Sequence, residues 1–207
     1  MKKFKSSLAA LALTGAMALS SIASLSVHAA NYSALIYNTY PESQTQSSST
    51  VESRLELMNT STELYLPQVT IRYYFSNDDV DITNDNIDTF CSYAADRDGS
   101  PSYSNVDVKV KEIKDSLKTD TATHYIEVSF KATGDETQDH LPAGHFLIMD
   151  CGITAKEGLF DCTNDYSYNP QTGCNHLAPN GYVSVYWLDQ AIWCDRGFAP
   201  ANDSYVQ

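Results

Sequence analysis

Apolar and polar residues alternate along several short segments of this chain, and turn residues separate the segments. The stretch "YIEVSF" (125–130) is the clearest case, because Ile126, Val128 and Phe130 fall on one face and the intervening residues fall on the other. Alternation with a period of two residues is typical of β-strands. The chain is therefore predicted to consist mainly of β-sheet.

The same criteria predict nine strands, and a weak helical pattern around 108–117 competes with only one of them. The predicted strands are 32–38, 53–59, 69–76, 88–94, 106–113, 124–131, 143–150, 182–188 and 190–194. Many short antiparallel strands joined by polar turns indicate a sandwich or a closed barrel. We favour an all-β, antiparallel sandwich.

The first thirty residues differ from the rest of the chain. Three lysines precede an apolar run rich in small residues, and "VHAA" then offers a cleavage site. This combination is typical of a secretory signal peptide, and no later segment is apolar enough to span a bilayer. We expect residues 1–30 to be removed and residues 31–207 to form one secreted, extracellular domain, with 41–50 as a long loop inside it.

The expected mature domain is strongly acidic. Subtracting the three signal lysines from 13 Lys+Arg leaves 10 basic residues against 26 Asp+Glu, a net charge of −16. Such a surface repels phosphate backbones and anionic lipids, which argues against nucleic-acid and membrane partners. A neutral polymer or a cation remains compatible with this charge.

The cysteines determine which disulfides an exported form of this protein could contain. All five lie in the expected mature domain, and they are Cys91, Cys151, Cys162, Cys174 and Cys194. One or two disulfides are compatible with export, and a bond between Cys162 and Cys174 would close the loop between them. The odd number leaves at least one thiol without a partner inside the chain.

No pattern of catalytic residues stands out. The acidic residues cluster in turns without forming a recognisable pair, and Glu127 is expected on an exposed strand face. The histidines lack metal-ligand spacing, and the G-x-S-x-G nucleophile motif is absent. We therefore do not expect an enzyme.

An ordered set of motifs runs over nearly the whole mature chain. The set comprises "LMNTSTELYLPQVTIRYYFSNDD", "DTFCSYAA", "HYIEVSF", "LPAGHFLI", "TNDYSYN" and "VSVYWLDQAIW". In this order the motifs resemble the family 3 carbohydrate-binding module. The resemblance implies a jelly-roll β-sandwich of about nine strands. It also implies a non-catalytic module that binds cellulose or a related β-glucan.

The resemblance further implies a structural calcium between two distant turns. The residues that match the family's ligands are Ser76, Asp78, Asp161, Asn164 and Asp165. Calcium prefers six to eight oxygen ligands from carboxylates, amides and main-chain carbonyls, and these residues offer that mixture. The alternative is that they are solvated turn residues, since Asp and Asn favour turns.

Cellulose-binding members of the family use a planar strip that contains a Trp, a Tyr, a His and an Arg–Asp ion pair. The Asp and His positions of that strip match Ser92 and Tyr93, and the tyrosine matches Tyr103. Ungapped matching places the arginine at Cys151 and the tryptophan at Glu157, so most of the strip is lost. Tyr93 and Tyr103 could form a smaller two-ring platform, or they could be ordinary exposed turn residues.

Family members also carry a shallow groove on the opposite face. The matching residues here are Arg72, Tyr74, Tyr125 and Tyr166, all of the family type. Ring faces and a guanidinium group suit a soluble glycan chain or an extended peptide. The alternative is that these tyrosines only pack along the edge of the sandwich.

The leading hypothesis is thus a secreted, calcium-stabilised module that binds a β-glucan, alone or through a separate secreted enzyme or scaffold protein. The alternative is a cell-surface or scaffold interaction module that kept the fold and lost binding to crystalline cellulose.

Overall fold

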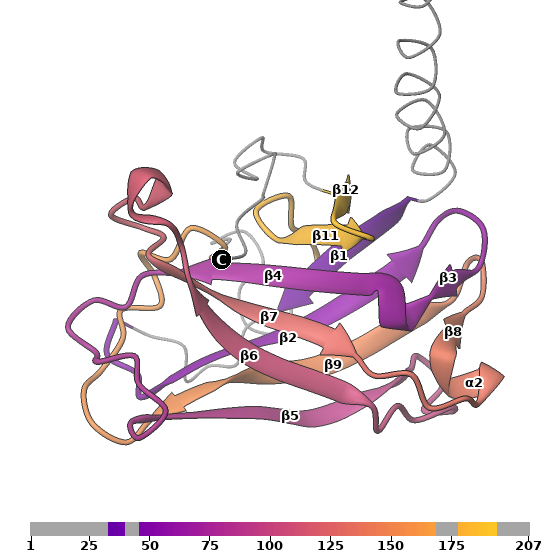
Figure 1. Ribbon diagram of the computed structural model, residues 1–207, viewed down its shortest axis with the longest axis horizontal. Coiled ribbons are helices and arrows are strands. Elements are labelled where there is room, and N and C mark those ends of the chain that lie inside the picture. The colour runs from indigo at the N-terminus through magenta and orange to yellow at the C-terminus, as the bar shows by residue number, and fades with distance from the viewer. Residues whose placement is uncertain (1–32, 40–45, 169–177, 194–207) are drawn as a thin grey trace, which may run out of the picture. The chain divides into compact units, whose positions relative to one another are not determined.

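The computed structural model describes residues 33–39, 46–168 and 178–193 of the chain (Figure 1). Within this part, nine strands have four or more residues and three have two residues each. In chain order they are β1 (Ala34–Thr39), β2 (Thr50–Asn59), β3 (Leu64–Tyr65), β4 (Val69–Phe75), β5 (Ile87–Asp96), β6 (Val106–Glu112), β7 (His124–Phe130), β8 (His140–Leu141), β9 (Phe146–Ala155), β10 (Ala178–Pro179), β11 (Ser184–Trp187) and β12 (Gln190–Trp193). Two 3-10 turns, η1 (Leu66–Gln68) and η2 (Asp115–Leu117), and the four-residue helix α2 (Glu136–Asp139) are the helical elements of the described residues.

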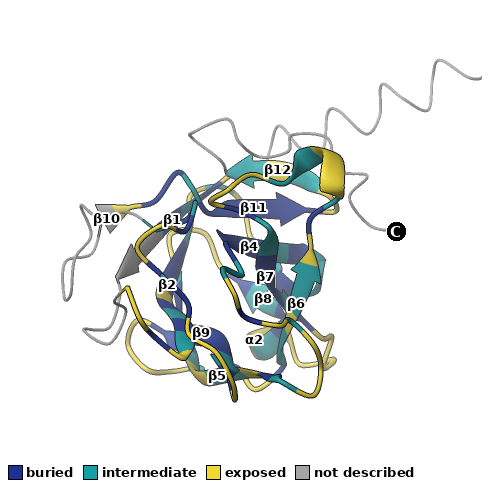
Figure 2. Cartoon of the chain, turned by 90° about the vertical axis from the view of Figure 1, so that its left-hand side faces the viewer, coloured by how far each residue is buried: buried dark blue, intermediate teal, exposed yellow. Residues whose placement is uncertain are grey.

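Two five-stranded sheets form the body of the fold. The first sheet has the order β10-β1-β2-β9-β5, the second sheet has the order β12-β11-β4-β7-β6, and β3 pairs with β8 separately. Every strand pairing in the described residues is antiparallel. Figure 2 shows the two sheets facing each other, with buried segments on both. The chain is therefore an antiparallel β-sandwich of the jelly-roll type, as expected.

The core lies between the two sheets because alternate side chains of each strand point inward. On β2, Leu55 and Leu57 are buried while Arg54, which precedes them, is exposed. Both leucines belong to one large cluster that includes Ile71 of β4 and Val128 of β7. Full burial of each such side chain stabilises the fold by roughly 1.5–3 kcal/mol. The inward-facing residues that produce the period-two pattern therefore also stabilise the packing of the two sheets.

The nine predicted strands correspond to the nine longer strands of the structure. The largest shift is in β9, which was expected at 143–150 and runs from Phe146 to Ala155. Gly144 has a φ of 79° and belongs to a turn before the strand. Gly152 weakens the strand pattern in the sequence, yet β9 continues through it. The strand expected at 106–113 is confirmed against the weak helical pattern at 108–117: β6 extends to Glu112, and only the short turn η2 follows.

The expected signal peptide lies outside the described residues. In the part that is described, neither the 3-10 turns nor α2 has the length and apolar composition needed to cross a bilayer.

Candidate functional site

The outward side of the first sheet gathers aromatic rings and ion pairs across β5, β9 and β2. We call this surface the outer face, and its principal side chains are Arg54, Glu56, Phe90, Tyr93, Arg97, Phe146 and Asp150. Strand alternation explains the grouping, since the residues between them on β2 and β9 point into the core. The polar and aromatic side chains of these three adjacent strands therefore lie in neighbouring rows across the sheet.

The central row of the outer face joins Arg54, Asp150 and Tyr93, which are direct cross-strand partners. The Arg54 Nε lies 3.5 Å from Asp150 Oδ1, and its guanidinium carbon lies 5.9 Å from the centre of the Tyr93 ring. Tyr93 is 39% exposed, and the neighbouring Ser92 hydroxyl donates to the Asp150 carbonyl at 3.4 Å. Burial raises the pKa of the Asp150 carboxyl, and the charge of Arg54 opposes that shift. The row therefore presents an open ring next to an arginine–carboxylate pair.

A second arginine–carboxylate pair crosses β9 farther along the outer face. The Arg97 Nη2 donates to Glu56 Oε2 at 2.9 Å, and the guanidinium carbon lies 3.4 Å from the centre of the Phe146 ring. The Arg97 side chain is about half exposed, whereas Glu56 is largely buried. This row offers guanidinium N–H groups above an aromatic ring.

Phe90 lies at the other end, opposite Gly152 of β9. A Cβ atom on Gly152 would come within 2.8 Å of Phe90 Cζ and 2.4 Å of the Val51 carbonyl oxygen. Only glycine lets the ring and the backbone approach this closely, so the Phe90 ring lies directly on the sheet. Between Gly152 and Phe146 the strand rises about 20 Å, at about 3.4 Å per residue, which is the length of several sugar units.

Tyr93 and Tyr103 do not form the two-ring platform that the sequence offered as one of two alternatives. Tyr103 is only 5% exposed and belongs to the main core cluster, whereas Tyr93 lies on the outer face. The chain folds back after β5, so that the Tyr103 amide donates to the Ala94 carbonyl at 2.8 Å and the side chain turns inward. Burial and the charge of Asp96 raise the pKa of Tyr103 to about 12.

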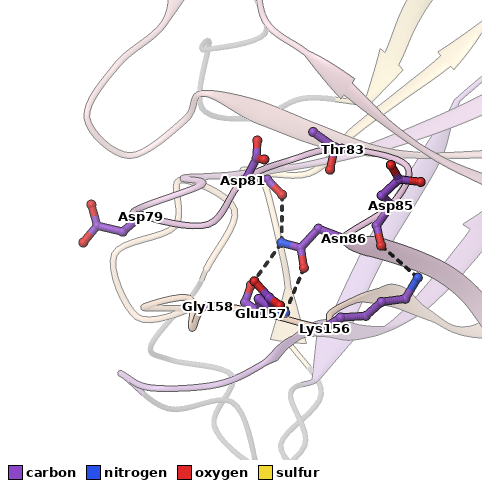
Figure 3. A pocket seen from close by; sticks show the side chains of 8 residues that line it. All are labelled: Asp79, Asp81, Thr83, Asp85, Asn86, Lys156, Glu157 and Gly158. Atoms are coloured by element: carbon purple, nitrogen blue, oxygen red, sulfur yellow. Dashed lines mark hydrogen bonds between the residues drawn. The ribbon is translucent and has the colours of Figure 1, made fainter.

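The position that matched the strip tryptophan, Glu157, lies beside an open hollow at one end of the sandwich (Figure 3). Asn86 crosses this hollow: its side-chain amide donates to the carbonyls of Asp81 and Glu157, and its Oδ1 accepts from the Glu157 amide. The acidic side chains around the hollow are spread apart, with that of Asp79 directed away from Asn86. Glu157 therefore contributes to loop structure and not to an aromatic surface.

The predicted groove residues come together on the outward side of the second sheet, but three of them are buried. The guanidinium carbon of Arg72 lies 4.9 Å from the Tyr125 ring centre and 4.5 Å from that of Tyr186. Arg72 is 4% exposed, and its Nε lies 3.4 Å from Glu127 Oε2, while Lys111 Nζ pairs with Glu127 Oε1 at 2.7 Å. An open groove built from these groups is therefore wrong for the structure described.

Local packing explains part of this burial. Tyr74 and Tyr125 form a second apolar cluster with Ile113 and Ala122, which lie in the connection from β6 to β7. Tyr166 is half-buried, and its ring lies edge-on to Tyr74 with 6.1 Å between the centres. The connection after β6 therefore covers the tyrosines that the sequence placed in a groove.

The two turns predicted to share a calcium lie against each other. Asp78 Oδ2 accepts from the Asp161 amide at 2.7 Å, and Asp78 Oδ1 accepts from the Asn164 side-chain amide at 3.0 Å. Asp165 Oδ1 accepts from the Ser76 amide at 2.9 Å. Asp78 has a φ of 48°, a left-handed conformation that aspartate tolerates better than most residues. All five predicted residues thus belong to one junction between the turns.

Asp165 is the unusual member of this junction. It is 4% exposed, and its Oδ2 atom is buried without a hydrogen-bond partner. Burial raises the pKa of this carboxyl well above its ordinary value; the Ser76 amide opposes the shift, and the charges of Asp78 and Asp161 add to it. A buried carboxylate oxygen without a partner is costly unless a proton or a cation compensates it.

The junction is not a site made of carboxylates alone. The described residues contain no group of three or more acidic, histidine or cysteine side chains placed to hold a metal ion by themselves. A hard cation at this junction would also need the Asn164 amide oxygen and main-chain carbonyls, which is the mixture calcium accepts.

Comparison with known proteins agrees with this architecture. The family profile described as the cellulose binding domain, CBM_3, matches residues 37–194. Among curated proteins, none matches this sequence.

Solved structures of the same family share the fold. A family IIIa cellulose-binding domain from Clostridium cellulolyticum has a TM-score of 0.63 at 21% identity, covering 79% of this chain and 98% of that one. A biomass-sensing module from a putative Rsgi-like protein of Clostridium thermocellum has a TM-score of 0.65 at 16% identity, covering 79% and 98%. The CBM3a-L domain of the scaffoldin cipA from Clostridium thermocellum has a TM-score of 0.63 at 22% identity, covering 86% and 96%. With the profile spanning most of its length, the chain belongs to carbohydrate-binding module family 3.

Proposed function

We propose that this chain is a secreted, non-catalytic module that binds cellulose or a related β-glucan on its outer face and is stabilised by a structural calcium. Membership of a carbohydrate-binding family supports the general class of ligand. The apolar, lysine-led N-terminal segment supports secretion.

The row of Tyr93, Asp150 and Arg54 is the observation that carries the proposal. β-Glucans present flat faces of pyranose C–H groups edged by hydroxyls, and an exposed aromatic ring buries apolar area against such a face. The half-exposed guanidinium groups of Arg54 and Arg97 can donate to hydroxyls, and their carboxylate partners can accept. A neutral sugar polymer is also not repelled by the acidic surface of the chain.

This surface differs in its residues from the strip that the resemblance implied. The arginine–aspartate pair comes from Arg54 and Asp150 on two neighbouring strands, and Tyr93 supplies the open ring. Phe90 and Phe146 add half-buried rings at the two ends. We therefore expect binding to amorphous chains or single chains to exceed binding to crystalline cellulose, which demands a longer row of open rings.

The junction of the two turns fits a calcium ion. Asp78, Asp161, Asn164 and Asp165 would supply side-chain oxygens, and Ser76 and Asp161 would supply main-chain carbonyls. When bound, the ion would supply the positive charge that the buried Asp165 oxygen lacks. Because the ligands come from segments far apart in sequence, bound calcium would stabilise the folded chain by mass action.

Retention on insoluble glucans tests the proposal. The purified chain is mixed with microcrystalline cellulose, amorphous cellulose and soluble cello-oligosaccharides, each with calcium and with a chelator. We expect retention on amorphous cellulose and no release of reducing sugar from it. Failure to bind any of these glucans would refute the proposal, and release of reducing sugar would refute its non-catalytic part.

A second candidate is an interaction module, acting at the cell surface or on a scaffold, that kept the fold without cellulose binding. Its support is that Tyr93 is the only exposed Phe, Tyr or Trp side chain among the residues whose burial is described. This candidate predicts that Tyr93→Ala changes no glucan binding, whereas the leading proposal predicts a loss. The glucan assay on this one variant separates the two.

A further inference from the structure

Two cysteines face each other across the first sheet. Cys91 of β5 and Cys151 of β9 are direct cross-strand partners, and their Sγ atoms are 2.9 Å apart. Partners on antiparallel strands have Cα atoms about 4.5–5.5 Å apart, within the range of about 4.4–6.8 Å that disulfides require. A disulfide bond is about 2.05 Å long, so the two sulfurs need to approach by less than about 1 Å.

The two cysteines differ in how far they are buried. Cys151 is buried and belongs to the core cluster, whereas Cys91 is only half-buried. The register of β5 against β9 shifts between Cys91 and Tyr93, and this bulge turns the Cys91 thiol so that it donates to the Tyr93 carbonyl at 3.3 Å. A small oxidant in solution can therefore reach Cys91 first.

The third described cysteine has no such partner. Cys162 is a buried free thiol that donates to the Thr50 carbonyl at 3.4 Å. The bond to Cys174 that the sequence suggested involves a residue that lies outside the described part of the chain. Within the described part of the chain, the Cys91–Cys151 pair is thus the one arrangement of two cysteines close enough to bond.

We propose that Cys91 and Cys151 form an intrachain disulfide that joins β5 to β9 beside the bulge carrying Tyr93. The inference rests on the register and the sulfur–sulfur distance, and it does not depend on the ligand that the outer face binds.

Thiol–disulfide exchange with a small-molecule disulfide such as oxidised glutathione would form the bond. The Cys91 thiol loses its proton and attacks one sulfur of the oxidant, which gives a mixed disulfide and releases one glutathione. The Cys151 thiol then loses its proton and attacks Cys91 Sγ, which releases the second glutathione. Two electrons and two protons pass from the cysteine pair to the oxidant, which is reduced to two thiols. The hydrogen bond that Cys151 donates lowers the pKa of the Cys91 thiol, which favours this order of attack.

The bond would restrict both the unfolded and the folded chain. The two cysteines are 60 residues apart in sequence, so the bond closes a long loop and lowers the conformational entropy of the unfolded state. In the folded state it would fix the strand pair next to Tyr93, on the inward side of the same sheet.

Peptide mapping of the oxidised protein tests the inference. The full chain is incubated with oxidised glutathione, its remaining thiols are alkylated, and it is digested without reductant. We expect a cross-linked peptide pair that contains Cys91 and Cys151, lighter by two hydrogen atoms than the separate peptides. Recovery of both cysteines in alkylated form, or a bond from Cys91 to any other cysteine, would overturn the inference.

Thermal unfolding provides a second measurement with a matched control. Oxidation should raise the Tm of the wild type and of Cys162→Ser by several degrees and leave the Tm of Cys91→Ser unchanged. Cys91 is the better position to replace because its side chain is half-buried, so the variant should still fold. Equal shifts in Cys91→Ser and Cys162→Ser would show that a different disulfide is responsible and would also overturn the inference.

Discussion

Replacing Asp165 by asparagine tests whether the junction of the two turns holds calcium. The side-chain carbonyl introduced by Asp165→Asn would keep the bond that Oδ1 accepts from the Ser76 amide at 2.9 Å. The substitution removes the charge and turns the partnerless Oδ2 into an amide nitrogen. Without calcium the variant loses only a buried, uncompensated charge, so in chelator we expect it to be at least as stable as the wild type.

The size of the calcium effect follows from mass action. At a free calcium concentration about 100-fold above Kd, binding stabilises the folded state by about 2.7 kcal/mol. In a domain of this size each kcal/mol raises Tm by about 2–4 °C, so calcium should raise the Tm of the wild type by about 5–11 °C. If the loss of one carboxylate weakens binding by about 100-fold, only about 0.4 kcal/mol remains, or about 1–2 °C.

The assay is thermal unfolding at neutral pH with excess calcium and with excess chelator. Asp79→Asn is the matched control, because Asp79 belongs to the same turn and its side chain is exposed. The control should keep the full calcium shift. A wild type that does not respond to calcium, or an Asp165→Asn variant with the same shift as the control, would refute the reasoning.

Three further substitutions test how the fold is held together. Arg72→Met should destabilise the chain by about 3 kcal/mol in chemical denaturation, because it leaves Glu127 buried with one partner fewer; a change below about 1 kcal/mol would contradict the buried ion pair. Gly152→Ala should cost about 1–3 kcal/mol, since its Cβ would overlap the main chain; a neutral result would show that the strands are farther apart. Burial raises the pKa of Asp139, but hydrogen bonds from the Thr133 and Gly134 amides outweigh it and hold the pKa below its ordinary value. The ionised Asp139 carboxylate should therefore stabilise the folded chain above the pKa that Asp139 has when unfolded, and this stabilisation should be lost as pH falls through its folded pKa. Asp139→Ala should remove that part of the acid dependence of the free energy of unfolding.

Local pattern was sufficient to predict most of the sandwich. The alternation in β7 and β2 places Ile126, Val128, Leu55 and Leu57 on the core side of their sheets, and each strand carries this information in its own residues. The junction of the two turns was also predictable, because the family motif contains both of its segments.

The outer face could not be read in the same way, because it depends on how strands align. Ungapped matching placed the strip arginine at Cys151, but that side chain points into the core, and its neighbour Asp150 points outward to Arg54. A shift of one residue moves a side chain to the opposite face of a sheet. The bulge between Cys91 and Tyr93 adds another such shift, and a single sequence does not reveal it.

Burial of aromatic residues depended on distant segments. Tyr103 follows a turn that returns it to the core, and Tyr125 is covered by the connection that contains Ile113 and Ala122. An aromatic residue on a turn or strand edge has the same local pattern whether it binds a ligand or fills a core. The sequence therefore identified the candidate rings without deciding which of them is open to solvent.

A depletion isotherm on amorphous cellulose tests the central claim most directly. The wild type, Tyr93→Ala and Leu188→Ala are compared at equal concentration; Leu188 is an exposed apolar control between β11 and β12 of the second sheet. We predict that the wild type and Leu188→Ala bind alike, and that Tyr93→Ala loses about 1–2 kcal/mol, or roughly 5–30-fold in affinity, with an unchanged Tm. A wild type that stays in solution, or equal isotherms for wild type and Tyr93→Ala, would contradict glucan binding by the outer face.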